Sequence, residues 1–227
     1  MPTDEFETLH ASPDGVLRIL SWCTDGADFA DERRSAWVEV FKEWRTIVDE
    51  YTDVTGDPAY WNHEIANVSF LSAAVWRVRM VAVQEFHAPR TADRGLPRGR
   101  ADLWARIGGT SYLLEAKVVF LPLDSRTAVA DVAYELTTAV AEARDYQDTH
   151  EFCGGIVFGI PNSPRPGDFP ARISAWRSSP RAELTKVAPH GIVVDYFPPK
   201  GANILKPNND YYPGVTIVLG FAPAPTT

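Results

Sequence analysis

RADLWARIGGTSYLLEAK, the stretch from Arg100 to Lys117, decides how this chain of 227 residues folds. Its Gly108-Gly109 pair separates two runs rich in leucine, aromatic and β-branched residues, which is the usual signal of a tight β-hairpin. If the two glycines form the loop, a count outward along both strands places Asp102 directly opposite Glu115. The stretch therefore predicts two paired strands with a carboxylate on each.

The two faces of this hairpin are expected to differ, because side chains alternate between the faces of a strand. One face would carry Arg100, Asp102, Trp104, Arg106, Glu115 and Lys117. The other would carry Ala101, Leu103, Ala105, Ile107, Tyr112, Leu114, Ala116, Val118 and Phe120. One face is therefore predicted to be core and the other charged.

The expected position of Asp102 directly opposite Glu115 is unfavourable unless another group neutralises the two negative charges. Directly opposed side chains have Cβ atoms about 4.5–5.5 Å apart, and like charges so placed are destabilising. A divalent cation reverses the sign, because such ions bind carboxylate oxygens at about 2.0–2.6 Å. The alternative is a solvated charged face, on which Arg100, Arg106 and Lys117 neutralise the acids. The apolar residues on both sides of Glu115-Ala116-Lys117 favour an interior strand, where charges are rarely placed without a function.

Asp102, followed on the next strand by Glu115-Ala116-Lys117, resembles the motif of the PD-(D/E)xK nuclease superfamily. The resemblance implies a restriction-endonuclease-like fold and a Mg²⁺ ion, which Mn²⁺ could replace, bound by Asp102 and Glu115. It further implies the backbone carbonyl of Ala116 as a metal ligand and Lys117 as the group that serves the attacking water. The motif departs from the family pattern where Ala101 stands in place of proline.

The elements expected around the hairpin follow the α-β-β-β-α-β order of that family, over a core of about residues 58–160. They are a helix from about Asp57 to Trp76, a strand over 78–86, the hairpin, a helix from Thr127 to about Asp148, and a strand over 154–160.

Glu64 is a carboxylate on the inward stripe of the first of these helices, together with Val68, Leu71 and Val75. The resemblance implies an acid on this helix that reaches the metal site, and Glu64 matches that position. The alternative is an acid of the first helical turn that interacts favourably with the helix dipole. Both interpretations remain open at the level of the sequence.

The chain is expected to form a single α/β domain over residues 1–227 with a central mixed sheet. Three segments are expected outside the core. Residues 1–15 would form a weakly ordered lead-in, and residues 16–57 would form an N-terminal helical addition with a strand at 16–23 and a helix at 31–51. Residues 161–227 would form a Pro/Gly-rich extension with a helical stretch at 171–176 and strands at 191–197 and 215–221. The last two strands would either extend the sheet or form a layer over the site.

A basic segment leads directly into Asp102 and contains Arg90, Arg94, Arg98 and Arg100. Guanidinium groups match the geometry of phosphate, so these four arginines are candidate substrate-binding residues. The alternative is an ordinary solvated loop. Glu85 and His87, near the end of the preceding strand, are weaker candidates, because an isolated histidine is more often structural than catalytic.

Composition restricts the class of function. A formal net charge of −8 argues against a protein that coats nucleic acid non-specifically, but a local basic segment can still bind a polyanion, because charges are screened over about 8 Å at physiological salt. No apolar run is long enough to cross a membrane. Cys23 and Cys153 have neither metal-ligand spacing nor a disulfide pattern, which favours a reducing cytoplasm.

These observations together predict a Mg²⁺-dependent nuclease that acts on DNA rather than RNA. Its catalytic residues would be Asp102, Glu115, Lys117 and Glu64. Two alternatives stay open: a member of the superfamily that has lost catalysis and serves as a binding or assembly module, and an unrelated α/β protein with a charged hairpin. The sequence also leaves a homodimer open.

Overall fold

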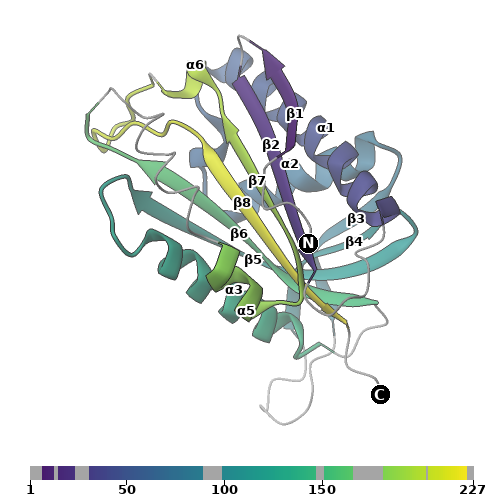
Figure 1. The fold of residues 1–227 in the computed structure, drawn as a ribbon. Coiled ribbons are helices and arrows are strands. Elements are labelled where there is room, and N and C mark those ends of the chain that lie inside the picture. The colour runs from purple at the N-terminus through teal and green to yellow at the C-terminus, as the bar shows by residue number, and fades with distance from the viewer. Residues whose placement is uncertain are drawn as a thin grey trace.

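The computed structural model describes seven segments of the chain, which are residues 7–12, 15–23, 31–88, 99–146, 151–165, 181–202 and 204–223. These segments form a three-layer α/β structure in which helices cover both faces of one eight-stranded mixed sheet (Figure 1). The strands are β1 (Glu7–Ser12), β2 (Gly15–Cys23), β3 (Val81–Ala88), β4 (Gly99–Ile107), β5 (Thr110–Pro122), β6 (Phe152–Asn162), β7 (His190–Phe197) and β8 (Val215–Pro223). The helices are α1 (Asp31–Thr55), the 3₁₀ turn η1 (Ala59–Trp61), α2 (Glu64–Arg77), α3 (Ala128–Ala143), α5 (Arg181–Val187) and α6 (Pro199–Ala202).

The order of the strands in the sheet is β1-β2-β7-β8-β6-β5-β4-β3. Neighbouring strands are antiparallel except β5 and β6, which are parallel and are joined through α3. The predicted order of helix, strand, hairpin, helix and strand is therefore present as α2, β3, β4–β5, α3 and β6. Of the two alternatives for the C-terminal strands, the first is correct, because β8 pairs with β6 and β7 pairs with β8 inside the sheet.

One face of the sheet is covered by α1 and α2. The predicted long helix is confirmed and extends to Thr55, and its aromatic residues Trp37, Phe41 and Trp44 are completely buried in the largest apolar cluster. The spacing of these aromatics therefore reflects core packing.

The opposite face is covered by α3, which packs over β5, β6 and β8, and by α5, which packs against α3 and contributes Leu184 to the apolar cluster on this face. Close packing of α3 requires Gly155 on β6, because a Cβ there would lie 2.6 Å from the Cβ of Ala139. This close approach fixes the height of α3 above the strands that carry the candidate site.

Several predicted boundaries are wrong. The second helix begins at Glu64 and not at Asp57, because the side chain of Asn67 donates hydrogen bonds to the carbonyls of Tyr60 and Asn62 and holds the preceding residues in an irregular turn. The strand expected from residue 78 begins at Val81.

Two further expectations concern the ends of helix α3 and of the chain. Helix α3 ends at Ala143, five residues before the predicted end. Residues 7–12, expected to be irregular, pair with β2 at the edge of the sheet. The helical stretch expected at 171–176 lies outside the described residues.

Neither Cys23 nor Cys153 forms a disulfide bond. No helix within the described segments is long and apolar enough to cross a membrane.

Candidate functional site

The β4–β5 hairpin has the register that the glycine pair predicts. Leu103 pairs with Leu114 and Ile107 with Thr110, and Gly108 and Gly109 both take positive φ angles, of 58° and 82°. The paired ladder ends at Leu103 and Leu114, one position before the two carboxylates. Asp102 and Glu115 therefore lie where the two strands separate.

A side chain replaces the main-chain pairing at this point. The Oδ2 atom of Asp102 accepts a hydrogen bond of 2.7 Å from the backbone N–H of Ala116. The position opposite Asp102 on β3 is also irregular, because Glu85 has a φ of 50° and lies between the paired residues Gln84 and Phe86. The sheet is thus distorted on both sides of Asp102.

Because of this distortion, the hairpin does not have the two continuous faces, one apolar and one charged, that the sequence predicts. Leu103 packs in the cluster of α1 and α2, as expected, but Ala101 packs on the other side with Ala143 and Tyr146. The charged face is not solvated along β5 either, because α3 covers it and leaves Glu115 only 4% exposed. Phe120, expected in the core, is 40% exposed near the end of β5.

Glu115 is the central carboxylate of the site. Its Oε1 atom is buried and has no hydrogen-bond partner among the residues that the structure describes. Burial raises the pKa of Glu115 to about 8, and the negative charge of Asp102 and a hydrogen bond that protonated Glu115 donates to Asp102 act in the same direction. In the absence of a cation, the Glu115 carboxyl group therefore binds a proton more tightly than an ordinary glutamate does.

The hydroxyl of Tyr146 interacts with the Glu115 carboxylate. This hydroxyl is 2.9 Å from the carbonyl oxygen of Arg100, to which it can donate, and it also lowers the pKa of Glu115 by a hydrogen bond to that carboxylate. A hydroxyl has one hydrogen, so it donates to one of these acceptors at a time. Tyr146 thus connects the start of β4 to the Glu115 carboxylate on β5.

Lys117 lies close to Asp102 and Glu115 but forms its ion pair with a third acid, Glu142. Its Nζ atom is 2.7 Å from Oε2 of Glu142 on α3, and the two side chains are 23% and 37% exposed. Burial opposes the charge of Lys117, but the hydrogen bond and the charge of Glu142 outweigh it, so that the pKa of Lys117 is raised. Lys117 is therefore an ammonium group held between β5 and α3.

Glu64 lies in the first turn of α2, half-buried, and interacts electrostatically with the same group of residues. Its pKa is raised by burial and then by the negative charge of Asp102, while Lys117 opposes the shift. The structure thus places Glu64 within electrostatic range of both Asp102 and Lys117.

The candidate substrate-binding arginines are only partly described. Arg100 is 60% exposed at the start of β4 and forms an ion pair with Glu85 of β3. Arg90, Arg94 and Arg98 lie outside the described residues. His87 is exposed and pairs in the ladder with Arg100.

The fit of the site to a divalent cation depends on its oxygen atoms. Within the described segments, no group of three or more His, Cys, Asp or Glu side chains is close enough to hold an ion as it stands. Two features nevertheless suit a hard cation: the hydrogen-bonded carboxyl groups of Asp102 and Glu115, and the buried, unpartnered Oε1 of Glu115. A cation that displaced the proton of Glu115 would neutralise both carboxylates and would give the Oε1 atom of Glu115 a partner.

Sequence reasoning assigned no role to Glu142 or Tyr146. They are four residues apart, at the end of α3 and in the turn that follows, and they interact with the two ends of Glu115-Ala116-Lys117. A spacing of four residues near a helix end is a weak signal, because it places two residues on one side of the helix without showing what lies there.

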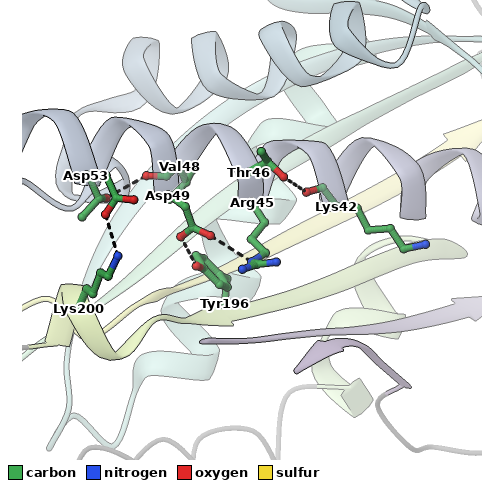
Figure 2. A network of polar contacts seen from close by, with 9 residues as sticks. Lys42, Arg45, Thr46, Val48, Asp49, Asp53, Tyr196 and Lys200 are labelled. Carbon is green, nitrogen blue, oxygen red and sulfur yellow. Dashed lines mark hydrogen bonds and ion pairs between the residues drawn. The ribbon is translucent and has the colours of Figure 1, made fainter. Parts of the chain in front are cut away.

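A second polar cluster lies away from this site, between α1 and β7 (Figure 2). Asp49 binds the hydroxyl of Tyr196 and the guanidinium of Arg45, and Lys200 Nζ is 2.8 Å from Oδ1 of Asp53. A small cleft lies beside these groups and is lined by Asp49, Thr52, Asp53, Pro198 and Lys200. Since its charges are paired with one another, this cluster is best explained as a connection between α1 and the sheet.

Comparisons with known proteins give no independent assignment: no family model, curated protein or solved structure matches this chain.

Proposed function

We propose that this protein is a Mg²⁺-dependent phosphodiester hydrolase that acts on DNA in preference to RNA. The observation that carries the proposal is the meeting of Asp102 and Glu115 at the point where β4 and β5 separate, with one buried Glu115 oxygen unpartnered within the described segments. A protein gains nothing in stability from two apposed carboxylates unless a proton or a cation neutralises them.

The metal ligands in this proposal are the carboxylates of Asp102 and Glu115, the backbone carbonyl of Ala116, and Glu64, with Mn²⁺ as a substitute for Mg²⁺. A bound divalent ion supplies a water of lowered pKa and a Lewis acid for the phosphate oxygens. The hydrogen bond from Ala116 N–H to Asp102 holds that carboxylate in place before any ion arrives. Such preorganisation avoids the cost of orienting the ligand on binding.

Lys117 is the proposed partner of the attacking water. Its ammonium group follows Glu115 by two residues on the same strand and is 23% exposed, so a substrate phosphate can reach it. A cation at this position orients the water and offsets the negative charge that develops on the phosphorane.

The arrangement of elements supports the same proposal. The order α2, β3, β4, β5, α3, β6, with β5 and β6 parallel, corresponds to the α-β-β-β-α-β core of the restriction-endonuclease-like fold. In this assignment β8, β7, β2 and β1 extend the sheet beyond β6.

The substrate is proposed to bind through Arg100 and through Arg90, Arg94 and Arg98 in the preceding segment. The Arg100 side chain is 60% exposed next to the site, so a phosphate can reach its guanidinium group, which forms an ion pair with the partly buried Glu85.

A second candidate is a binding or assembly module that has kept the site without catalysis. One observation favours it: the charge of Lys117 is already neutralised by Glu142. The two candidates differ in one measurable property, which is turnover.

The test is hydrolysis of single- and double-stranded DNA and RNA by the purified full chain, with Mg²⁺, with Mn²⁺ and with EDTA. Cleavage is expected only with metal, and Asp102→Asn, Glu115→Gln and Lys117→Ala are each expected to lower turnover by orders of magnitude with unchanged far-UV circular dichroism. Lys200→Ala, which removes a lysine from the Asp53 pair, is the matched control and should retain activity. Equal activity in the wild type and the three site variants would contradict the assignment, and metal binding without turnover would favour the second candidate.

A further inference from the structure

Lys117 has several negatively charged neighbours and binds only one of them at hydrogen-bonding distance within the described segments. The charges of Glu142, Glu64 and Glu115 all act on its ammonium group. Glu115 is the nearest along the chain, because residues two apart on a strand lie on the same face about 7 Å apart. The 2.7 Å hydrogen bond is nevertheless with Glu142, on a different element.

This choice of partner has a consequence for the carboxylates. A lysine bound to Glu115 or Asp102 would neutralise them and would occupy the space that a cation needs. With Lys117 bound to Glu142, the Oε1 atom of Glu115 stays buried and without a partner in the described part of the chain. The ion pair between α3 and β5 thus separates the ammonium from the acids.

Stability alone does not account for the Lys117–Glu142 pair. Both side chains are partly exposed, and ion pairs of this kind contribute little to the free energy of unfolding. Glu142 also lies near the end of a helix whose packing on Gly155 of β6 sets its distance from the strands, so its carboxylate is held at a defined position.

We propose that Glu142 is a positioning residue, which holds the Lys117 ammonium away from Asp102 and Glu115 and so keeps these two carboxylates available to a divalent cation. The inference rests on the proposed function, because it assumes that the carboxylates take a metal. It adds a residue that makes no contact with the metal and acts through Lys117.

The test measures binding of Mn²⁺ alone to the full chain, by the electron paramagnetic resonance signal of free Mn²⁺, without nucleic acid or turnover. Four proteins form a double-mutant cycle: the wild type, Glu142→Ala, Lys117→Met and the double variant. In Glu142→Ala, the ammonium group of Lys117 loses its partner and is expected to bind Asp102 or Glu115 instead. Mn²⁺ must then displace a charge-assisted hydrogen bond, which should weaken its binding about tenfold.

The decisive comparison is the effect of Glu142→Ala in the Lys117→Met background. If Glu142 acts through Lys117, its removal there should change the Mn²⁺ dissociation constant by less than about twofold, which is within the usual error of additivity. An equal decrease in affinity in both backgrounds would show that Glu142 acts only as one more negative charge, and would overturn the inference.

Two controls keep the result interpretable. Asp53→Ala removes the acid of the Lys200 pair and should leave Mn²⁺ binding unchanged. If Glu142→Ala does not fold, as judged by circular dichroism, Glu142→Gln replaces it in the cycle, since it keeps the volume of the side chain and removes the charge. A wild type that binds no Mn²⁺ would refute the proposed metal site itself, whereas binding with an additive cycle would refute only the role of Glu142.

Discussion

The carboxylate of Asp102 accepts a hydrogen bond from the backbone N–H of Ala116 at 2.7 Å, just beyond the point where the ladder between β4 and β5 ends. The bond satisfies a main-chain donor that the separation of the strands would otherwise leave unpaired. It also brings the Asp102 carboxyl group to the Glu115 carboxyl group. Asp102 therefore has both a structural and a proposed chemical function, and variants of it can separate the two.

Asp102→Asn is expected to leave the protein without metal as stable as the wild type or more stable. At a pH above about 8, where Glu115 is ionised, the amide oxygen introduced at position 102 would still accept from Ala116 N–H, and the charge repulsion between residue 102 and Glu115 would be removed. With saturating Mg²⁺ or Mn²⁺ the order should reverse, because a ligand at a hundred times its dissociation constant adds about 2.7 kcal/mol to the stability of a protein that binds it. Thermal melts of both proteins, with EDTA and with metal, measure the crossover.

Asp102→Ala is the companion variant, because it removes the acceptor as well as the charge. We expect it to be about 1 kcal/mol less stable than Asp102→Asn, because the N–H of Ala116 is left unpaired. In the melting experiment on the wild type and Asp102→Asn, equal increases in the two melting temperatures on addition of metal would show that Asp102 is not a metal ligand.

The raised pKa of Glu115 predicts how stability depends on pH. An acid whose pKa rises on folding, from 4.5 to about 8, binds a proton more tightly in the folded state. Its contribution is complete below pH 4.5 and is lost as the pH rises through about 8. The loss is about 1.4 kcal/mol for each unit by which the pKa is raised.

Urea unfolding of the wild type and Glu115→Gln, without metal and between pH 5 and about 8.5, measures this contribution. Relative to Glu115→Gln, the wild type should become progressively less stable as the pH rises in that range. Saturating Mg²⁺ should reduce this slope, because a cation stabilises the charged carboxylates. Parallel curves for the two proteins without metal would mean that Glu115 titrates at its ordinary pKa.

The local part of the site could be predicted from the sequence, and the tertiary part could not. The Gly108-Gly109 loop and the alternation of apolar residues determine the register of β4 and β5, because both signals lie within the hairpin itself. The reversal of faces at Ala101 depends on the positive φ of Glu85, on a strand outside the hairpin, and on the side-chain bond of Asp102. No periodic pattern encodes either of them.

The same distinction explains two other differences. Asp57-Pro58 carries the signals of a helix start, but the hydrogen bonds of Asn67 to the preceding turn override them, so that α2 begins at Glu64. The ion pair of Glu142 with Lys117 depends on how α3 lies across β5, which its packing on Gly155 sets. A sequence shows that α3 is amphipathic but does not show which residue of β5 lies opposite each of its turns.

The basic segment before β4 predicts a salt-dependent interaction with DNA. Replacement of Arg90, Arg94 and Arg98 together by alanine should weaken binding, measured with EDTA to prevent cleavage. The log–log slope of affinity against salt should decrease by about 0.9 for each phosphate of duplex DNA that the variant no longer binds. A matched control removes three other exposed cations, Lys42, Lys186 and Lys200, and should leave most of the slope unchanged. An unchanged slope in the arginine variant would mean that other residues of the chain bind the phosphates.

Tyr146→Phe removes only the hydroxyl that forms a hydrogen bond with the Glu115 carboxylate. The hydroxyl lowers the pKa of Glu115, so its removal should move that pKa further above its ordinary value, and the pH range over which the Glu115 contribution is lost should extend upward. Because the proton on Glu115 then competes more strongly with a cation, Mn²⁺ binding at neutral pH should weaken in Tyr146→Phe and recover as the pH is raised. Glu115→Gln removes the titrating group, and the added Tyr146→Phe substitution should then leave the pH dependence unchanged. A pH-independent weakening of Mn²⁺ binding in Tyr146→Phe would instead assign the hydroxyl to its other acceptor, the carbonyl of Arg100, and so to holding the start of β4.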